Sequence, residues 1–309
     1  MRIFVTGATG VVGRRLVPRL LGAGHDVSAV ARTQEKHAAL ERTGARAVTL
    51  DLFDRDAARA AVAGHDVVVN LATHVPSSGV RMFLPGAWRE MDRIRREASA
   101  NLADGALAGG STRFVQESFA PIYPDSGDRW IDETTRPRPG RYNRSVLDAE
   151  RAAERFGAGG GVWVVLRFAG FYGPDATHVL EMLPMVRRGW APLPGRPDAY
   201  WSSISHDDAA SAVLAALALP SGIYNVTDDE PLRRRDYFDA IADALGVPPP
   251  SPMPSWLPTL MGSLGETLSR SLRISNRKLR EASAWVPRLP SAREGWRAVV
   301  AALRDAERS

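Results

Sequence analysis

Three glycines near the start of the chain have the spacing of an anion-binding turn. Gly7, Gly10 and Gly13 follow an apolar run (Ile3–Val5) and precede an amphipathic segment. In such a turn the first glycine permits a tight bend, the second lets the backbone approach a pyrophosphate, and the third lets the following helix pack closely. Free N–H groups at the start of that helix favour an anion. The sequence therefore predicts a dinucleotide site, and the other residues of the turn expected to contact the cofactor are Thr9, Val11 and Val12.

The end of the second apolar run, Val27–Val30, bears on which dinucleotide binds. Folds that use NAD usually place an acid about 20 residues beyond the glycines to hold the ribose 2′-hydroxyl. This stretch has no acid and carries Arg32 instead. A guanidinium binds a phosphate through paired hydrogen bonds, so Arg32 favours NADP(H) over NAD(H). The alternative is that Arg32 is a solvated surface residue.

Short apolar runs alternate with amphipathic stretches through the first half of the chain. This pattern is typical of an α/β fold with a Rossmann-type, doubly wound parallel sheet. Helices are predicted over Trp88–Leu107 and Tyr142–Phe156, and a late strand over Ile223–Val226. The six earlier predicted strands are Ile3–Val5, Val27–Val30, Ala47–Leu50, Val67–Leu71, Phe114–Gln116 and Trp163–Leu166.

The character of the chain changes after Gly170, where prolines punctuate shorter elements. We therefore predict two lobes. Residues 1–168 form a Rossmann domain that binds NADP, with a return segment at about 202–227. Residues 169–201 and 228–309 form a smaller C-terminal lobe that binds substrate.

Composition excludes several kinds of site. The chain has no cysteine, which excludes disulfides, thiolate metal sites and cysteine nucleophiles. The lone pair His178 and Glu181 is too small a set for a metal site, so no metal is expected. The isoelectric point of 9.9 reflects arginine usage, since Lys36 and Lys278 are the only lysines. We expect a cytoplasmic protein that binds a small-molecule substrate and neither nucleic acid nor membrane.

An ordered series of short motifs resembles the extended short-chain dehydrogenases/reductases, the NAD-dependent epimerase/dehydratase family, over nearly the whole chain. The motifs are Thr6–Gly13, Asp51-Leu52, Asn70-Leu71-Ala72, Ile122-Tyr123, Tyr142 with Ala149-Glu150, Leu166-Arg167-Phe168, Tyr172-Gly173-Pro174, Asp207-Asp208-Ala209 and Tyr224-Asn225-Val226. The resemblance implies that Asp51 meets the adenine and that Ala72 lines the nicotinamide ribose. The neighbouring residues Leu52, Leu71 and Thr73 are expected on the cofactor as well.

The catalytic residues of that family are incomplete in this chain. The family places a serine or threonine four residues before the tyrosine of a Val-Tyr-Gly turn, and a Tyr-x-x-x-Lys pair on the next helix. Here these positions hold Phe119 and Val146, and only Tyr142 remains. Ser118 lies one residue away and points to the other side of an extended segment. Without lysine, Tyr142 is expected to keep its proton, and so to serve as a proton donor rather than as a base. The alternative is that Tyr142 only begins a helix.

Other side chains are candidates for the same site. Glu117, at the end of the fifth predicted strand, is a candidate acid or base, or else a solvated residue. The catalytic candidates are thus Tyr142, Glu117 and Ser118. Tyr142 is also a predicted cofactor contact. The residues predicted to contact substrate are His74, Phe119, Tyr123, Arg167, Phe171 and His178.

These features favour an NADPH-dependent reductase of a carbonyl or imine on a small organic molecule, with an atypical active site. Two alternatives stay open: a cofactor-retaining epimerase, dehydratase or cyclase, and a non-catalytic protein that senses NADP(H). A two-fold homodimer is expected through the helices Trp88–Leu107 and Tyr142–Phe156. The second of these has more apolar positions than one core-facing stripe needs, at Val146, Leu147, Ala149, Ala153 and Phe156.

Overall fold

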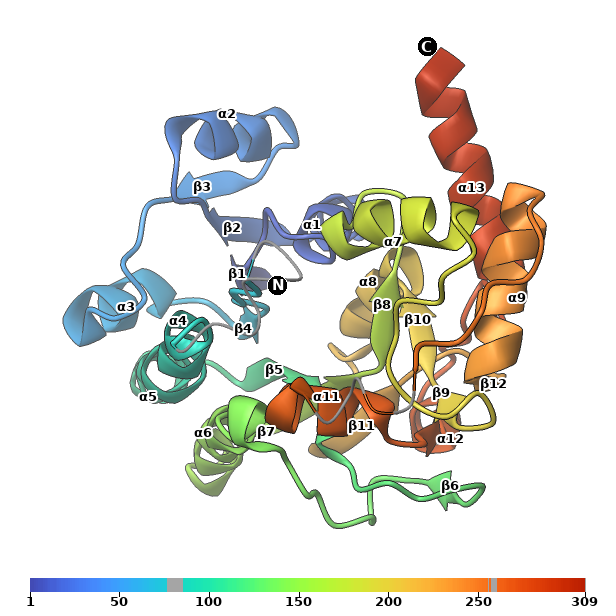
Figure 1. Cartoon of the computed structure of the whole chain (residues 1–309). Helices are drawn as coiled ribbons and strands as arrows, with labels where there is room; N and C mark the ends of the chain where they lie inside the picture. Colours follow the sequence, from blue (N-terminus) through green and yellow to red (C-terminus); the bar gives the residue numbers. More distant parts are fainter. Residues whose placement is uncertain (77–85, 255, 257–259, 309) are drawn as a thin grey trace.

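A seven-stranded parallel sheet in the order β11-β7-β5-β4-β1-β2-β3 organises the chain (Figure 1). The computed structural model describes residues 1–76, 86–254, 256 and 260–308. The strands of the sheet are β1 (Arg2–Thr6), β2 (Asp26–Val30), β3 (Arg46–Val48), β4 (Val67–Asn70), β5 (Arg113–Phe119), β7 (Val162–Phe168) and β11 (Gly222–Val226). The order reverses beside β1, which lies between β2 and β4. Ligands of doubly wound sheets bind at the carboxyl ends of the strands near such a reversal. The predicted α/β, Rossmann-type fold is confirmed.

Helices cover both faces of this sheet, which explains why its strands read as continuous apolar runs. Alternate residues of β1 enter different cores: Ile3 and Val5 belong to one, and Phe4 belongs to the other. The first core includes residues of α1 (Gly13–Gly22), α2 (Gln34–Arg42), α8 (His206–Ala215) and α12 (Arg277–Ala282). The second includes residues of α3 (Arg55–Val62), α5 (Ser99–Ala108) and α6 (Val146–Ala158).

The helix predicted over Trp88–Leu107 contains a π-helical turn. It is made of α4 (Arg89–Arg93), η2 (Ile94–Ala98) and α5. A π turn inserts an extra residue into the helix and changes which side chains point inward. As a result Arg95 is buried, with 5% of its surface exposed.

The helix predicted from Tyr142 begins four residues later, at Val146. Tyr142 instead lies in the short 3-10 helix η4 (Arg141–Asn143). The reason is local winding: Leu147 donates to the carbonyl of Arg144, three residues back, so the regular helix starts only after this turn. The predicted start of this helix was wrong.

A smaller lobe has a core of its own around Trp201 and Trp296. Its helices include α7 (Thr177–Arg187), α9 (Arg234–Leu245), α11 (Gly262–Ser269) and α13 (Ala292–Arg308). Three two-stranded sheets join parts of the chain: β8 (Gly170–Tyr172) with β10 (Ser203–Ser205), β9 (Tyr200–Trp201) with β12 (Leu232–Arg233), and β6 (Trp130–Ile131) with β13 (Arg273–Ile274). Through the last pair, residues within the predicted Rossmann domain pack against the C-terminal part, and the domain boundaries stay a prediction.

None of the helices in the described ranges combines the length and apolar composition needed to span a bilayer.

The apolar residues of α6 on which the predicted dimer rests are mostly buried in the core of the chain. Val146, Ala149, Ala153 and Phe156 are buried, and only Leu147 is partly exposed. A two-fold dimer therefore stays a prediction that rests on the helix positions. We expect light scattering at micromolar concentration to give twice the 33.6 kDa mass of one chain. A mass of one chain would contradict it.

Candidate functional site

The glycine turn between β1 and α1 is built so that only glycine fits at two positions. Gly7 has a φ of 66°, and a Cβ there would lie 2.2 Å from the carbonyl oxygen of Leu71. A Cβ on Gly13 would lie 2.2 Å from the carbonyl oxygen of Gly7. The helix after the turn begins at Gly13 without a side-chain cap, since Val12 is its N-cap residue. An uncapped helix start beside a glycine turn fits the pyrophosphate of a dinucleotide.

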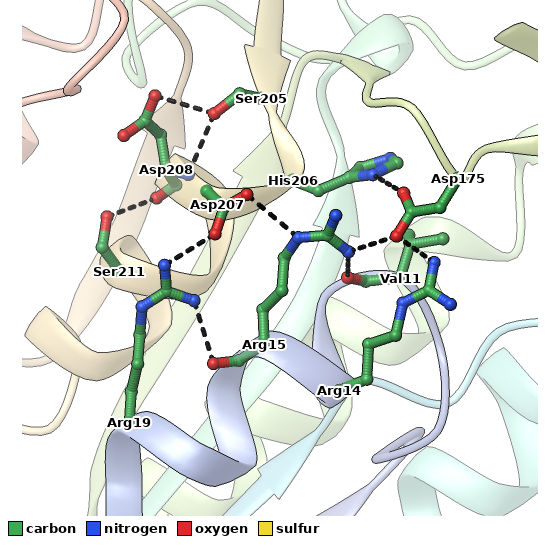
Figure 2. Close-up of polar contacts among 10 residues, drawn as sticks. All are labelled: Val11, Arg14, Arg15, Arg19, Asp175, Ser205, His206, Asp207, Asp208 and Ser211. Carbon is green, nitrogen blue, oxygen red and sulfur yellow. Dashed lines mark hydrogen bonds and ion pairs between the residues drawn. The ribbon is translucent and has the colours of Figure 1, made fainter. Parts of the chain in front are cut away.

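Arginines of α1 tie this turn to the segment that follows β8 (Figure 2). Arg14 and Arg15 both pair with Asp175, the latter at 2.8 Å between Nη1 and Oδ2. Arg15 and Arg19 also pair with Asp207 of α8, at 3.1 and 2.8 Å. Arg15 further donates to the carbonyl of Val11 within the turn, at 2.9 Å. The cofactor turn and the predicted substrate side are therefore held together by charge.

His206 forms the buried side of this network. Its Nδ1 lies 3.0 Å from Oδ1 of Asp175, and its ring packs on Phe171 at 5.8 Å between centroids. Burial lowers the pKa of His206 to about 4, although Asp175 opposes the change. The imidazole is therefore neutral at physiological pH. A Cβ on Gly173 would lie 2.2 Å from Nδ1 of His206, which explains the glycine in the Tyr-Gly-Pro motif.

The remaining predicted cofactor residues lie at the carboxyl ends of β2, β3 and β4. Asp51 is exposed, and its Oδ1 accepts a hydrogen bond from the N–H of Phe53 at 2.9 Å. Ala72 donates its N–H to Oδ1 of Asn70 at 3.2 Å. Leu52 and Ala72 are partly buried, Leu71 is buried and Thr73 is exposed. Since these strands run parallel to β1 in the same sheet, their carboxyl ends lie at the same edge as the glycine turn.

Arg32 follows β2 and has an acidic neighbour that the sequence did not reveal. Its Nη1 lies 3.7 Å from Oε1 of Glu90, and the side chain is 66% exposed. The same Glu90 oxygen lies 3.5 Å from Nδ1 of His74, which is predicted to contact substrate. Arg32 thus lies exposed at the edge of the sheet, where it can bind a 2′-phosphate. The phosphate would have to replace the carboxylate of Glu90 beside the guanidinium.

Replacing Arg32 by aspartate is expected to reverse the cofactor preference. The wild type should bind NADP(H) at least about tenfold tighter than NAD(H), and Arg32→Asp should lose this margin because a charge-assisted pair becomes a repulsion. Calorimetric titration of both cofactors measures it. Arg42→Asp, at the end of α2, makes the same charge change as a control. Equal dissociation constants in the wild type would contradict the prediction.

Alternation along β5 separates the candidate catalytic residues. Ser118 is 1% exposed, and its hydroxyl donates to Oε1 of Glu150 at 2.5 Å. Glu117 and Phe119, on either side of Ser118, are partly exposed. Ser118 therefore has a buried protein partner on the other side of the strand, in agreement with the direction predicted for it, and the geometry gives it a structural contact.

Two residues predicted to contact substrate belong to a buried network. Arg167 pairs with both carboxylate oxygens of Glu150, at 2.8 and 2.7 Å, and donates to the hydroxyl of Tyr123 at 2.8 Å. Tyr123 in turn donates to Oδ1 of Asn225 at 2.8 Å. Arg167 and Tyr123 are 2% and 0% exposed. The structure gives both a role in joining β5, β7, β11 and α6, and their contact with substrate stays a prediction without geometric support.

Tyr142 has a free buried hydroxyl. The hydroxyl makes no hydrogen bond with the described residues, and its ring packs edge-on against Trp88 at 5.0 Å between centroids. Burial raises the pKa of Tyr142 well above its usual range, although Arg95 and Arg270 oppose the change. A phenol in this state carries its proton and can donate it.

The charge of Arg95 acts on both Tyr142 and Glu117. Burial raises the pKa of the Glu117 carboxyl, and the charge of Arg95 opposes this. Nη1 of Arg95 has no hydrogen-bond partner among the described residues. Sequence reasoning missed Arg95, because the π turn that brings it inward has no signature in the sequence. The site thus combines a phenol and a carboxyl whose pKa values are both raised by burial with one positive charge that opposes the change.

The other predicted substrate residues lie at the carboxyl ends of β5 and β8. Phe171 packs against Phe168 at 5.3 Å between centroids. His178, in the first turn of α7, places its Nε2 2.8 Å from the carbonyl oxygen of Phe171. His178 is therefore held by the backbone of β8, while Phe119 contributes an apolar ring where the family has a hydroxyl.

Comparison with known proteins identifies the family to which the chain belongs. The sequence pattern described as the NAD dependent epimerase/dehydratase family matches residues 3–227. The chain belongs to this family. A 3-diazoavenalumate denitrifying reductase of a Streptomyces species is 33% identical over 96% of the chain and 99% of its own length. A 2-alkyl-3-oxoalkanoate reductase of Shewanella oneidensis is 28% identical over 87% and 73%, respectively.

Solved structures share the fold. The human epimerase family protein SDR39U1 with NADPH superposes with a TM-score of 0.80 at 19% identity, over 97% of this chain and 99% of that one. The Thermus thermophilus UDP-glucose 4-epimerase in complex with NAD gives 0.77 at 25% identity, over 99% and 100%. The structures show the fold, and the family match together with the two reductase relatives supports a protein of the NAD(P)-dependent reductase or epimerase kind.

Proposed function

We propose that the protein is an NADPH-dependent reductase of a carbonyl or imine on a small organic molecule. The observation that carries this is the state of Tyr142, a buried phenol whose pKa is raised and which has no lysine partner. When hydride adds to the carbon of a carbonyl or imine, a reductase needs a group that gives a proton to the oxygen or nitrogen. An enzyme that oxidises an alcohol needs a base instead. The reductase names of two relatives support the same direction.

In this proposal each part of the site has one task. The glycine turn holds the pyrophosphate and Arg32 the 2′-phosphate. The bound nicotinamide supplies the hydride. Tyr142 gives a proton to the oxygen or nitrogen atom on which negative charge develops, and Glu117 is the second candidate donor. The positive charge of Arg95 acts to lower the pKa of both groups, and so favours the anion that each becomes when it gives up its proton. Phe119 and Val146 leave the place of the family's proton relay apolar.

Turnover with a substrate panel tests the proposal. We expect NADPH oxidation, followed by absorbance, with at least one aldehyde, ketone or cyclic imine, and no conversion of nucleotide sugars. Conversion of a substrate without net oxidation of NADPH would indicate cofactor-retaining chemistry instead. Tight NADPH binding without turnover of any compound would indicate a sensing protein.

One relative's name favours a second candidate function. The name 3-diazoavenalumate denitrifying reductase describes a reduction that removes nitrogen from a diazo compound. If the acceptor is an aryl diazonium ion, the hydride forms the C–H bond while dinitrogen leaves with the C–N electron pair, so no proton is needed. A site with Phe119 and Val146 in place of the relay fits such a reaction. Aryl diazonium salts therefore belong in the panel.

A further inference from the structure

Arg234 is a buried guanidinium with unmet hydrogen-bond donors. It begins α9 and is 3% exposed. Its Nη2 donates to the carbonyls of Leu268 and Arg270, the latter at 3.0 Å, where α11 ends. Its Nε and Nη1 have no hydrogen-bond partner in the described part of the chain. Buried arginines normally have a partner for each donor, so this residue calls for another acceptor.

A cavity of about 240 Å³ adjoins this guanidinium. Three segments wall it: the loop 191–197, the start of α9 and the proline-rich stretch 249–252. Leu193 and Phe238 make apolar parts of the lining, together with Pro249 and Pro250. In Figure 1, α9 lies beside α13 on the opposite side of the molecule from α2 and α3, which flank the cofactor half of the sheet. None of the residues that line the cavity belongs to the site around Tyr142, and Arg270, whose carbonyl accepts from Arg234 and whose charge acts on Tyr142, lies between the two.

The acidic groups near Arg234 do not accept hydrogen bonds from its free N–H donors. The charge of Asp125 favours the charged form of Arg234, but burial outweighs it and lowers the pKa of Arg234 to about 10. Asp239 also lines the cavity, but no ion pair joins it to Arg234 among the residues described. Trp201 covers the guanidinium at 5.1 Å from Cζ to the ring centroid. A ligand in the cavity can supply the missing acceptor.

We propose that this cavity binds a small organic acid. Its carboxylate accepts hydrogen bonds from Arg234, and its apolar body lies against Leu193, Phe238 and the prolines. A carboxylate is the fitting anion because it brings one negative charge to one buried cation. The mostly apolar walls favour a ligand with a hydrocarbon or aromatic body over a bare inorganic anion. This inference rests on the geometry of the cavity and not on the proposed reaction.

Binding of benzoate to the whole protein tests the proposal, with benzamide as its neutral analogue. We expect saturable calorimetric binding of benzoate at a dissociation constant of about 1 mM or tighter, as for a ligand of this size, and none for benzamide. Arg234→Met should weaken benzoate binding by at least about tenfold. Arg187→Met, at an exposed position of α7 outside the lining, makes the same charge change and should alter benzoate binding by less than about twofold.

A second variant covers a folding defect in Arg234→Met, since Arg234 also holds the end of α11. Leu193→Trp fills the cavity from the loop 191–197, leaves Arg234 intact and should abolish benzoate binding. Equal binding of benzamide, unchanged binding in both variants, or no saturable binding would overturn the proposal. Phosphate binding as tight as benzoate would overturn the ligand class, and displacement of benzoate by NADPH would overturn its location.

Discussion

Tyr142→Phe is expected to lower the turnover of NADPH-dependent carbonyl reduction by about a hundredfold or more, the usual worth of a positioned general acid. The dissociation constant of NADPH should change little, because the variant keeps the ring against Trp88. Tyr224→Phe removes a hydroxyl that donates to the carbonyl of Pro220 at 3.0 Å, and serves as the control. Single-turnover rates separate this effect from product release.

The pH dependence follows from the raised pKa of Tyr142. A donor is lost when pH rises through its pKa, so reduction by the wild type should stay level across neutral pH and fall only in strongly alkaline solution. Oxidation of the corresponding alcohol needs the tyrosinate and should be very slow at neutral pH, rising as the solution becomes alkaline. Full activity of Tyr142→Phe on a carbonyl substrate would move the proton donor to Glu117. Full activity on an aryl diazonium ion alone would favour the second candidate function.

The strands of the sheet could be predicted from the sequence because a strand that is buried on both faces is a run of apolar residues. Each predicted strand of the sheet overlaps an observed one, from Ile3–Val5 within β1 to Ile223–Val226 within β11. The glycine turn was equally readable, since Gly7 needs a positive φ and the space of a missing Cβ. Requirements of this kind act on single residues and therefore appear in the sequence.

The positions of the site's side chains depend on contacts that the sequence does not display. Asp175 meets Arg15 across 160 positions of the chain, and Glu150 meets Arg167 from another element. The inward turn of Arg95 and the late start of α6 depend on helix winding that tertiary packing decides. Residue types alone thus identified Tyr142 and Glu117 as candidates, whereas their shared neighbour Arg95 needed the structure.

The buried pair of Glu150 and Arg167 leads to the largest expected effect on stability. Both side chains are almost fully buried, at 5% and 3% exposure, and the shorter of their contacts is 2.7 Å between Nη2 and Oε2. Arg167→Met leaves the carboxylate buried without its partner and is expected to cost about 3–5 kcal/mol of unfolding free energy. The hydroxyl of Tyr123 also loses the hydrogen bond that Arg167 donates to it.

Chemical denaturation of matched variants separates the charge from the packing. Arg167→Met combined with Glu150→Met should be less destabilised than Arg167→Met alone, because no buried charge is then left uncompensated. Arg277→Met, which breaks an exposed pair with Glu281, should leave stability nearly unchanged. If the double variant is as unstable as the sum of the two single variants, the carboxylate and guanidinium act independently. In that case packing rather than the ion pair would hold Arg167 in place, and its side chain would again be a candidate for substrate contact.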